Sequence, residues 1–213
     1  MNAKRNYQKE LDRLIAGLNG RRPSLLLHAC CAPCSSYVLE YLSRYFQITL
    51  FYYNPNIAPE SEYQYRVSEL RRLVTEMLPD AGITVLEGPY DPERFARAVR
   101  GLEGAPEGGA RCRVCFRLRL EEAAKMAREL GCDYFTTTLS ISPMKDAAAL
   151  NGIGEELAPI YRTPWLPSDF KKREGYKRSI QLSAEYQLYR QDYCGCIYSK
   201  LEREAQKQRK GVN

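Results

Sequence analysis

Short apolar runs alternate with longer amphipathic stretches along the chain. The runs of strand length fall at residues 24–29, 47–53, 82–87 and 132–141, the last of which includes a following loop. Apolar positions at helical spacing predict helices at about residues 7–18, 30–42, 60–78, 91–99, 115–130, 145–157 and 178–189. Strands that alternate with helices predict an α/β fold, with a parallel sheet, flanking helices and right-handed crossovers.

We expect one α/β domain over residues 1–213. A short N-terminal helix (about 1–20) and an irregular segment with C-terminal helices (about 159–213) are expected to pack on it. Hydrophobic residues make up 44% of the chain, which is enough for a packed core. No apolar run is long enough to cross a bilayer, and the polar N-terminus lacks the apolar centre of a secretory signal. We therefore expect a cytoplasmic protein with no membrane partner, and we expect it to be monomeric.

The charge balance is mildly basic, with 32 basic and 26 acidic residues and a net charge of +6. An excess of this size suggests a polyanionic partner without establishing one. A solvated charged surface is the alternative interpretation.

The eight cysteines are the strongest chemical signal in the sequence. Most of them fall in three groups, HACCAPC at 28–34, CRVC at 112–115 and CGC at 194–196. Structural disulfides are rare in the cytosol, so clustered cysteines in a cytosolic protein indicate metal ligands or redox groups. Cys132 stands alone after Gly131 and is expected to be a core residue.

Two of these groups lie where a metal site is expected. The first predicted strand delivers Cys30 and Cys31 to the carboxyl edge of the sheet, where ligands bind in folds of this kind. Cys112 and Cys115 precede a predicted helix, whose N-terminus favours the thiolate form. Iron–sulfur clusters commonly use four thiolates, so the two half-sites predict one cluster. Structural zinc and inert buried cysteines are the alternatives.

The third group permits a different chemistry. Because one glycine separates Cys194 from Cys196, a disulfide between them would close a tight, strained ring. Strained disulfides are labile and catalytic, so a redox-active pair is our first interpretation, and a contribution to the metal site is the alternative. His28, the one histidine of the sequence, is either a proton donor or a packing residue.

Together these motifs resemble those of the QueH-type epoxyqueuosine reductases. The resemblance rests on HACCAPCS at 28–35, YNPNI at 53–57, EYQYR at 62–66, RCRVCFRLRL at 111–120, TTTLSISPMKD at 136–146, DFKKREGYKRS at 169–179 and YRQDYCGCIYS at 189–199. It covers about residues 24 to 199. The order and number of these motifs make it more specific than a single C-x-x-C pair.

The resemblance implies a fold similar to that of the adenine-nucleotide alpha hydrolases. It also implies an activity, the reduction of epoxyqueuosine to queuosine at the wobble position of tRNA anticodons. Carried over by position, Cys30, Cys31, Cys112 and Cys115 are the implied ligands of a [4Fe-4S] cluster, and Cys194 and Cys196 form the implied redox-active disulfide. Cys34 is a further ligand, a ligand of an additional metal ion, or a packing residue. Cobalamin is not expected, and an electron donor that the sequence does not identify is required.

The residues offer partners for this chemistry. Removal of an epoxide oxygen as water needs two electrons and two protons, and Tyr193, Tyr189 and Lys145 are candidate proton donors. Basic residues near aromatic side chains are the candidates for contact with RNA. They are Arg66, Lys171, Lys172, Arg173, Lys177 and Arg178, for each of which a solvated face is the alternative. The rival functions are a tRNA-binding sulfur transferase of the same fold and a non-catalytic, zinc-bound RNA-binding module.

Overall fold

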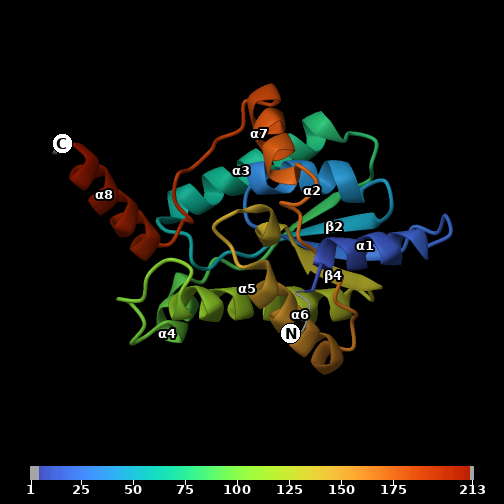
Figure 1. Ribbon diagram of the computed structural model, residues 1–213, viewed down its shortest axis with the longest axis horizontal. Coiled ribbons are helices and arrows are strands. Elements are labelled where there is room, and N and C mark those ends of the chain that lie inside the picture. Colours follow the sequence, from blue (N-terminus) through green and yellow to red (C-terminus); the bar gives the residue numbers. More distant parts are fainter. Residues whose placement is uncertain (1–4, 212–213) are drawn as a thin grey trace.

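The computed structural model describes residues 5–211 and contains a four-stranded parallel sheet in the order β3-β2-β1-β4 (Figure 1). The strands are β1 (Ser24–Ala29), β2 (Gln47–Tyr52), β3 (Thr84–Glu87) and β4 (Tyr134–Thr137). In the central strand, Leu27 pairs with Leu50 of β2 on one side and with Thr136 of β4 on the other. The predicted α/β fold with a parallel sheet is therefore confirmed, whereas the likeness to the nucleotide hydrolases stays a prediction.

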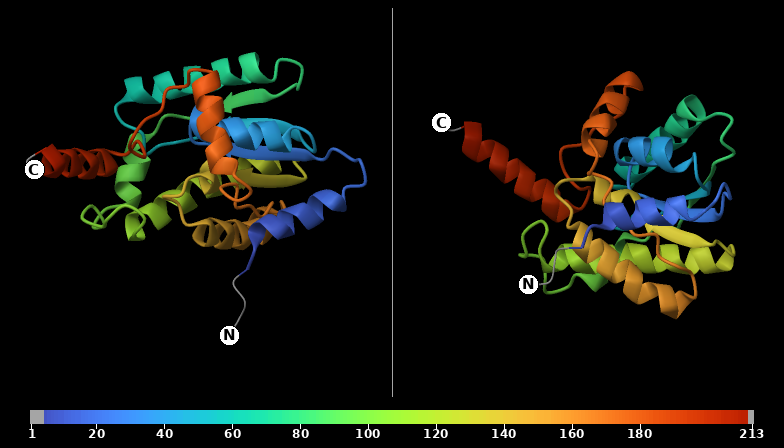
Figure 2. Two further views of the ribbon diagram at one scale, coloured as in Figure 1. Left: turned by 45° about the horizontal axis from the view of Figure 1, so that its top comes forward. Right: turned by 45° about the vertical axis from the view of Figure 1, so that its right-hand side comes forward.

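The helices cover both faces of the sheet (Figures 1 and 2). They are α1 (Tyr7–Ala16), α2 (Ala32–Leu42), α3 (Glu60–Met77), α4 (Pro92–Ala98), α5 (Ala110–Glu129), α6 (Ala147–Tyr161), α7 (Gly175–Glu185) and α8 (Ile197–Gly211), with a 3₁₀ turn, η1 (Thr138–Ile141), after β4. Among the described residues, no helix is long and apolar enough to cross a membrane.

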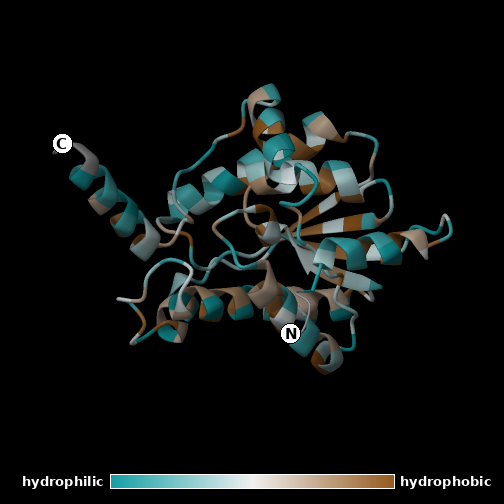
Figure 3. Cartoon of the chain, viewed as in Figure 1, coloured by the Kyte–Doolittle hydropathy of each residue, from teal (hydrophilic) through white to brown (hydrophobic). Residues whose placement is uncertain are grey.

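Alternation along β1 divides the hydrophobic core into two parts. Leu25 and Leu27 pack with residues of α1, α2 and α3, whereas Leu26 packs with residues of α5 and α6. Side chains of a strand point to opposite faces in turn, so a central strand that is buried on both faces becomes continuously apolar. Apolar residues accordingly gather where the helices meet the sheet (Figure 3).

Several element boundaries differ from the prediction. Helix α5 begins at Ala110, with Gly109 as its N-cap, so Cys112 and Cys115 lie inside its first turns rather than before them. Helix α6 continues through Pro159 to Tyr161, and α7 begins at Gly175. The irregular segment is therefore shorter than expected. Helix α8 extends away from the body of the molecule (Figure 2).

Candidate active site

The first group of thiols lies where β1 passes into α2. Cys31 is the N-cap of α2 and Pro33 stands in its first turn, where a missing N–H is tolerated. The sulfur atoms of Cys30, Cys31 and Cys34 all lie within 4.8 Å of one another, and 3.8 Å separates the first two. These three residues could hold a metal ion.

The three thiols do not ionise alike. Hydrogen bonds from Cys30 and Cys34, together with the positive charge of Arg66, hold the pKa of the Cys31 thiol well below its usual range. The same contacts raise the pKa of Cys34 well above it. Because metal ions bind the thiolate form, Cys31 is ready to coordinate one without first losing a proton.

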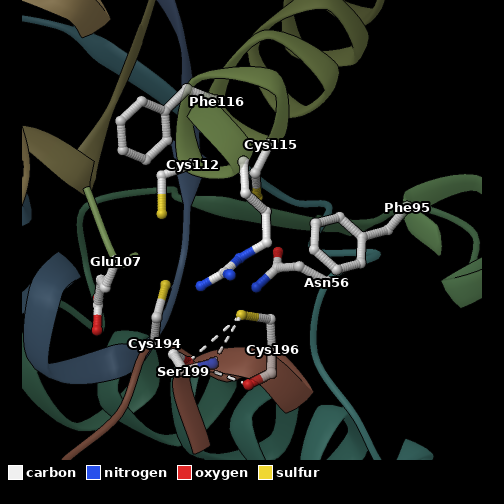
Figure 4. Close-up of a pocket in the computed structure, with 10 residues that line it drawn as sticks. Asn56, Phe95, Glu107, Cys112, Cys115, Phe116, Cys194, Cys196 and Ser199 are labelled. Carbon is white, nitrogen blue, oxygen red and sulfur yellow. Dashed lines mark hydrogen bonds between the residues drawn. The ribbon is translucent and has the colours of Figure 1, made fainter. Parts of the chain in front are cut away.

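The second and third groups of thiols line one pocket. Cys112 and Cys115 of α5 meet Cys194 and Cys196, which lie just before α8, and Glu107 shares the pocket. Figure 4 shows the sulfur atoms of Cys112, Cys194 and Cys196 pointing into the same space. Segments far apart in the sequence thus bring four thiols together.

A buried arginine links this pocket to the first group of thiols. Arg119 of α5 is 1% exposed, and its guanidinium donates to Asn54, which in turn donates to the carbonyl of Ala29 at 2.9 Å. Burial lowers the pKa of Arg119, but the negative charges of Cys115 and Cys30 raise it above its usual value. Its Nε atom has no hydrogen-bond partner among the described residues.

Arg119 therefore needs an anionic neighbour. A buried cation without a counterion is strongly destabilising, and no carboxylate of the described residues pairs with it. The charges that favour its protonated form come from thiolates of both cysteine groups. The site is consequently built for negative charge held by sulfur.

Another buried arginine fixes the Cys-Gly-Cys segment. The guanidinium of Arg66 pairs with Glu62 at 2.7 Å, donates to the carbonyl of Cys194 at 3.3 Å and lies over the ring of Tyr193. Gly195 has a φ of +113°, and a Cβ atom there would lie 2.9 Å from the Arg66 guanidinium. Glycine is required at this position because the backbone is both left-handed and closely approached.

Lys145 and Glu107 border the same segment. The ammonium of Lys145, in the turn before α6, lies 3.3 Å from the sulfur of Cys194 and 2.9 Å from a carboxylate oxygen of Glu107. Among the candidate proton donors, Lys145 is the one with a direct contact to a cysteine of the pocket. Tyr189 instead donates to Glu62 at 3.3 Å.

His28 lies inside the sheet rather than at the pocket. Its Nδ1 atom is 2.8 Å from the hydroxyl of Thr137, and its Nε2 atom donates to the carbonyl of Tyr53 at 3.0 Å. Burial and the charge of Arg119 lower the pKa of His28 to about 3. Both ring nitrogens are engaged and the ring is neutral at ordinary pH, which is the geometry of a packing residue.

The residues predicted to contact RNA fall into two places. Arg66 is buried beside the Cys-Gly-Cys segment, so its charge serves that segment in this structure. The other five lie at and before the start of α7, where most of them pair with acids. The pairs are Lys171 with Asp169, Arg173 with Asp12, Lys177 with Glu174 and Arg178 with Glu40, and Lys172 is exposed.

All eight cysteines are free thiols in this structure. The disulfide implied for Cys194 and Cys196 is therefore not formed here, and its redox role stays a prediction. Cys132 packs against the apolar cluster between α5 and the sheet, as a core residue does. Among the described residues, it is the one cysteine outside the groups just described.

A parallel α/β domain with buried thiols and buried cations at the carboxyl edge of its sheet defines a cysteine-based redox or metal enzyme. The family model for epoxyqueuosine reductase QueH matches residues 25–202. The chain belongs to this family.

Curated relatives agree over nearly the full length. The chain is 46% identical to epoxyqueuosine reductase QueH of Streptococcus pyogenes serotype M1, over 93% of this chain and 79% of the relative. It is 43% identical to the QueH of Staphylococcus epidermidis, over 94% and 87% of the two chains. It is 35% identical to the QueH of Thermotoga maritima, over 84% and 92%.

Sequence reasoning missed the buried cations. Arg111 and Arg119 are each 1% exposed, although arginine is normally a surface residue. A signal was present, because Arg111, Cys115 and Arg119 follow one another at intervals of four residues along α5. Cations that share a helix face with cysteines indicate a site that carries negative charge.

Proposed function

We propose that the protein reduces epoxyqueuosine to queuosine at the wobble position of a tRNA anticodon. Cys30, Cys31, Cys112 and Cys115 hold a [4Fe-4S] cluster, and Cys194 and Cys196 act as the redox-active pair. The observation that carries this proposal is Arg119, a buried cation whose favourable partners are thiolates of both cysteine groups. Family membership supports the substrate.

The donor set fits such a cluster. It offers cysteine sulfur from two segments, one thiol whose pKa is already lowered, and buried arginines that offset anionic charge. Cys34, within 4.8 Å of the other two sulfurs of its group, is a spare thiol for ligand exchange or for an additional metal ion. When bound, the cluster supplies single electrons and a Lewis-acidic iron.

The chain's own residues complete the chemistry. The dithiol of Cys194 and Cys196 holds two electrons and two protons, which it releases when a disulfide forms. Loss of the epoxide oxygen as water consumes two electrons and two protons, so one dithiol matches one turnover. Arg66 and Gly195 hold this pair in place, and Lys145 carries a proton at Nζ beside Cys194.

A tRNA substrate requires a surface that accepts phosphates. Lys171, Lys172, Arg173, Lys177 and Arg178 are the proposed contacts, around the start of α7. An exposed lysine such as Lys172 is available at once, whereas the paired ones exchange an acid for a phosphate. The electron donor that restores the dithiol is a further partner.

The test is a turnover assay with tRNA that carries epoxyqueuosine. The protein is reconstituted anaerobically with iron and sulfide, given a chemical reductant, and the tRNA nucleosides are separated by mass. We expect queuosine to accumulate with the wild type and to be absent with Cys194→Ser. The proposal fails if the protein binds stoichiometric zinc, stays colourless after reconstitution and leaves epoxyqueuosine unchanged.

A further inference from the structure

The two thiols of the Cys-Gly-Cys segment lie in unequal environments. Cys194 is partly exposed, and its sulfur is 3.3 Å from the ammonium of Lys145. Cys196 is 6% exposed, and its thiol donates to the hydroxyl of Ser199 at 3.4 Å. One sulfur thus faces a cation, and the other faces a neutral hydroxyl group.

Lys145 is held as a cation although it is buried. It is 7% exposed, and its ammonium also pairs with Glu107 at 2.9 Å. Burial alone lowers the pKa of Lys145, but the charges of Cys194 and Glu107 raise it well above its usual value. The attraction is mutual, so the charge that favours the ammonium equally favours a thiolate at Cys194.

Other charged groups face this pair from the neighbouring elements. Arg66 of α3 donates to the backbone carbonyl of Cys194, and the charge of Arg119 on α5 also interacts with Cys194. Thiolates at Cys112 and Cys115 would oppose a negative charge there. Of all these groups, Lys145 is the one that donates to the sulfur itself.

We propose that Lys145 is a positioning residue that holds Cys194 as the thiolate and reactive member of the pair, while Cys196 stays a protonated thiol. Glu107 fixes the ammonium in place. The thiolate is the nucleophile in thiol chemistry, so Cys194 is the first of the two to react with an electrophile. The inference gives the proposed redox pair a direction and rests on the proposed function for its purpose.

The test measures thiol reactivity in the full chain, with metal removed by chelation and thiols kept reduced. Iodoacetamide, a neutral electrophile, is added at about pH 7.5, and alkylation of each cysteine is followed by peptide mass spectrometry. We expect Cys194 to react about tenfold or more faster than Cys196. In Lys145→Met, the rate at Cys194 should fall about tenfold, as loss of a charge-assisted hydrogen bond predicts.

Control variants separate charge from structure. Lys145→Arg keeps the charge and should stay within about threefold of the wild type. Lys171→Met removes a lysine that is also ion-paired, here to Asp169, and should leave Cys194 unchanged. If methionine disturbs the fold by circular dichroism, Lys145→Gln replaces it, because it removes the charge and keeps a donor. At about pH 10 the difference between wild type and variant should shrink, since the thiol then ionises unaided.

Two results overturn the inference. An unchanged rate at Cys194 in the charge-free variant excludes Lys145 as the stabilising cation. A parallel rise at Cys194 and Cys196 indicates a structural role, because loosened packing exposes both. Failure of the proposed function looks different, since Cys194 would still depend on Lys145 while the wild type left epoxyqueuosine unreduced. Conversely, turnover by the wild type with an unchanged Cys194 rate in the variant rejects the inference alone.

Discussion

Acid should weaken this protein through its single histidine before its carboxylates titrate. His28 is fully buried with both ring nitrogens engaged, and its pKa is lowered to about 3. In the unfolded chain a histidine takes up a proton near pH 6.5. Between these values the unfolded state binds more protons, so the free energy of unfolding is complete above about 6.5 and falls as the pH is lowered.

The magnitude follows from the width of this window. Each pH unit below about 6.5 costs ~1.4 kcal/mol, so lowering the pH from about 7.5 to about 5 removes ~2 kcal/mol of the unfolding free energy. The carboxylates with lowered pKa values, such as Asp133, where hydrogen bonds from Ser24 stabilise the charge, titrate below this window.

The assay is urea unfolding of the metal-free, reduced protein at these two pH values, with His28→Gln as the comparison. Glutamine does not titrate, so the variant should lose less stability by ~2 kcal/mol over the same interval. Groups other than His28 contribute equally to both proteins, so the difference isolates the histidine. An equal loss in both proteins would refute the assigned burial and neutrality of His28.

Three further predictions concern the thiol site. Arg119→Met should lower the iron content after anaerobic reconstitution, because the arginine opposes the burial that raises the pKa of Cys115 to about 12; an unchanged iron content contradicts this role. Cys115→Ala should lose iron whereas Cys132→Ala keeps it, and equal retention in both would exclude Cys115 as a ligand. Gly195→Ala should cost about 1–3 kcal/mol in urea unfolding because φ is +113° there, whereas Gly152→Ala in α6, where an added Cβ meets open space, should be neutral or stabilising.

The fold and the location of the first thiols could be predicted because their signals are local. An apolar run of strand length followed by Cys30, Cys31 and Pro33 fixes both the strand and the helix that follows. The start of α5 was placed too late, because the glycine-rich loop hid Gly109 as the N-cap and the helix begins at Ala110. Helix caps depend on single residues, so boundaries are less certain than elements.

The electrostatics of the site could not be predicted from the sequence in the same way. Arg66 stood in a motif with tyrosines and was interpreted as an RNA contact, yet its guanidinium reaches the carbonyl of Cys194, more than a hundred residues later in the chain. The contact between Lys145 and Cys194 likewise joins distant segments. Such pairs depend on tertiary packing, for which one sequence carries no local pattern.

The central claim is that thiols from distant segments together hold an iron–sulfur cluster. Iron and acid-labile sulfide, measured per chain after anaerobic reconstitution, test it most directly. The account predicts about four of each in the wild type and a loss of both when Cys30, Cys31, Cys112 and Cys115 are replaced by alanine. Stoichiometric zinc without sulfide in the wild type, or full iron and sulfide in that variant, would contradict it.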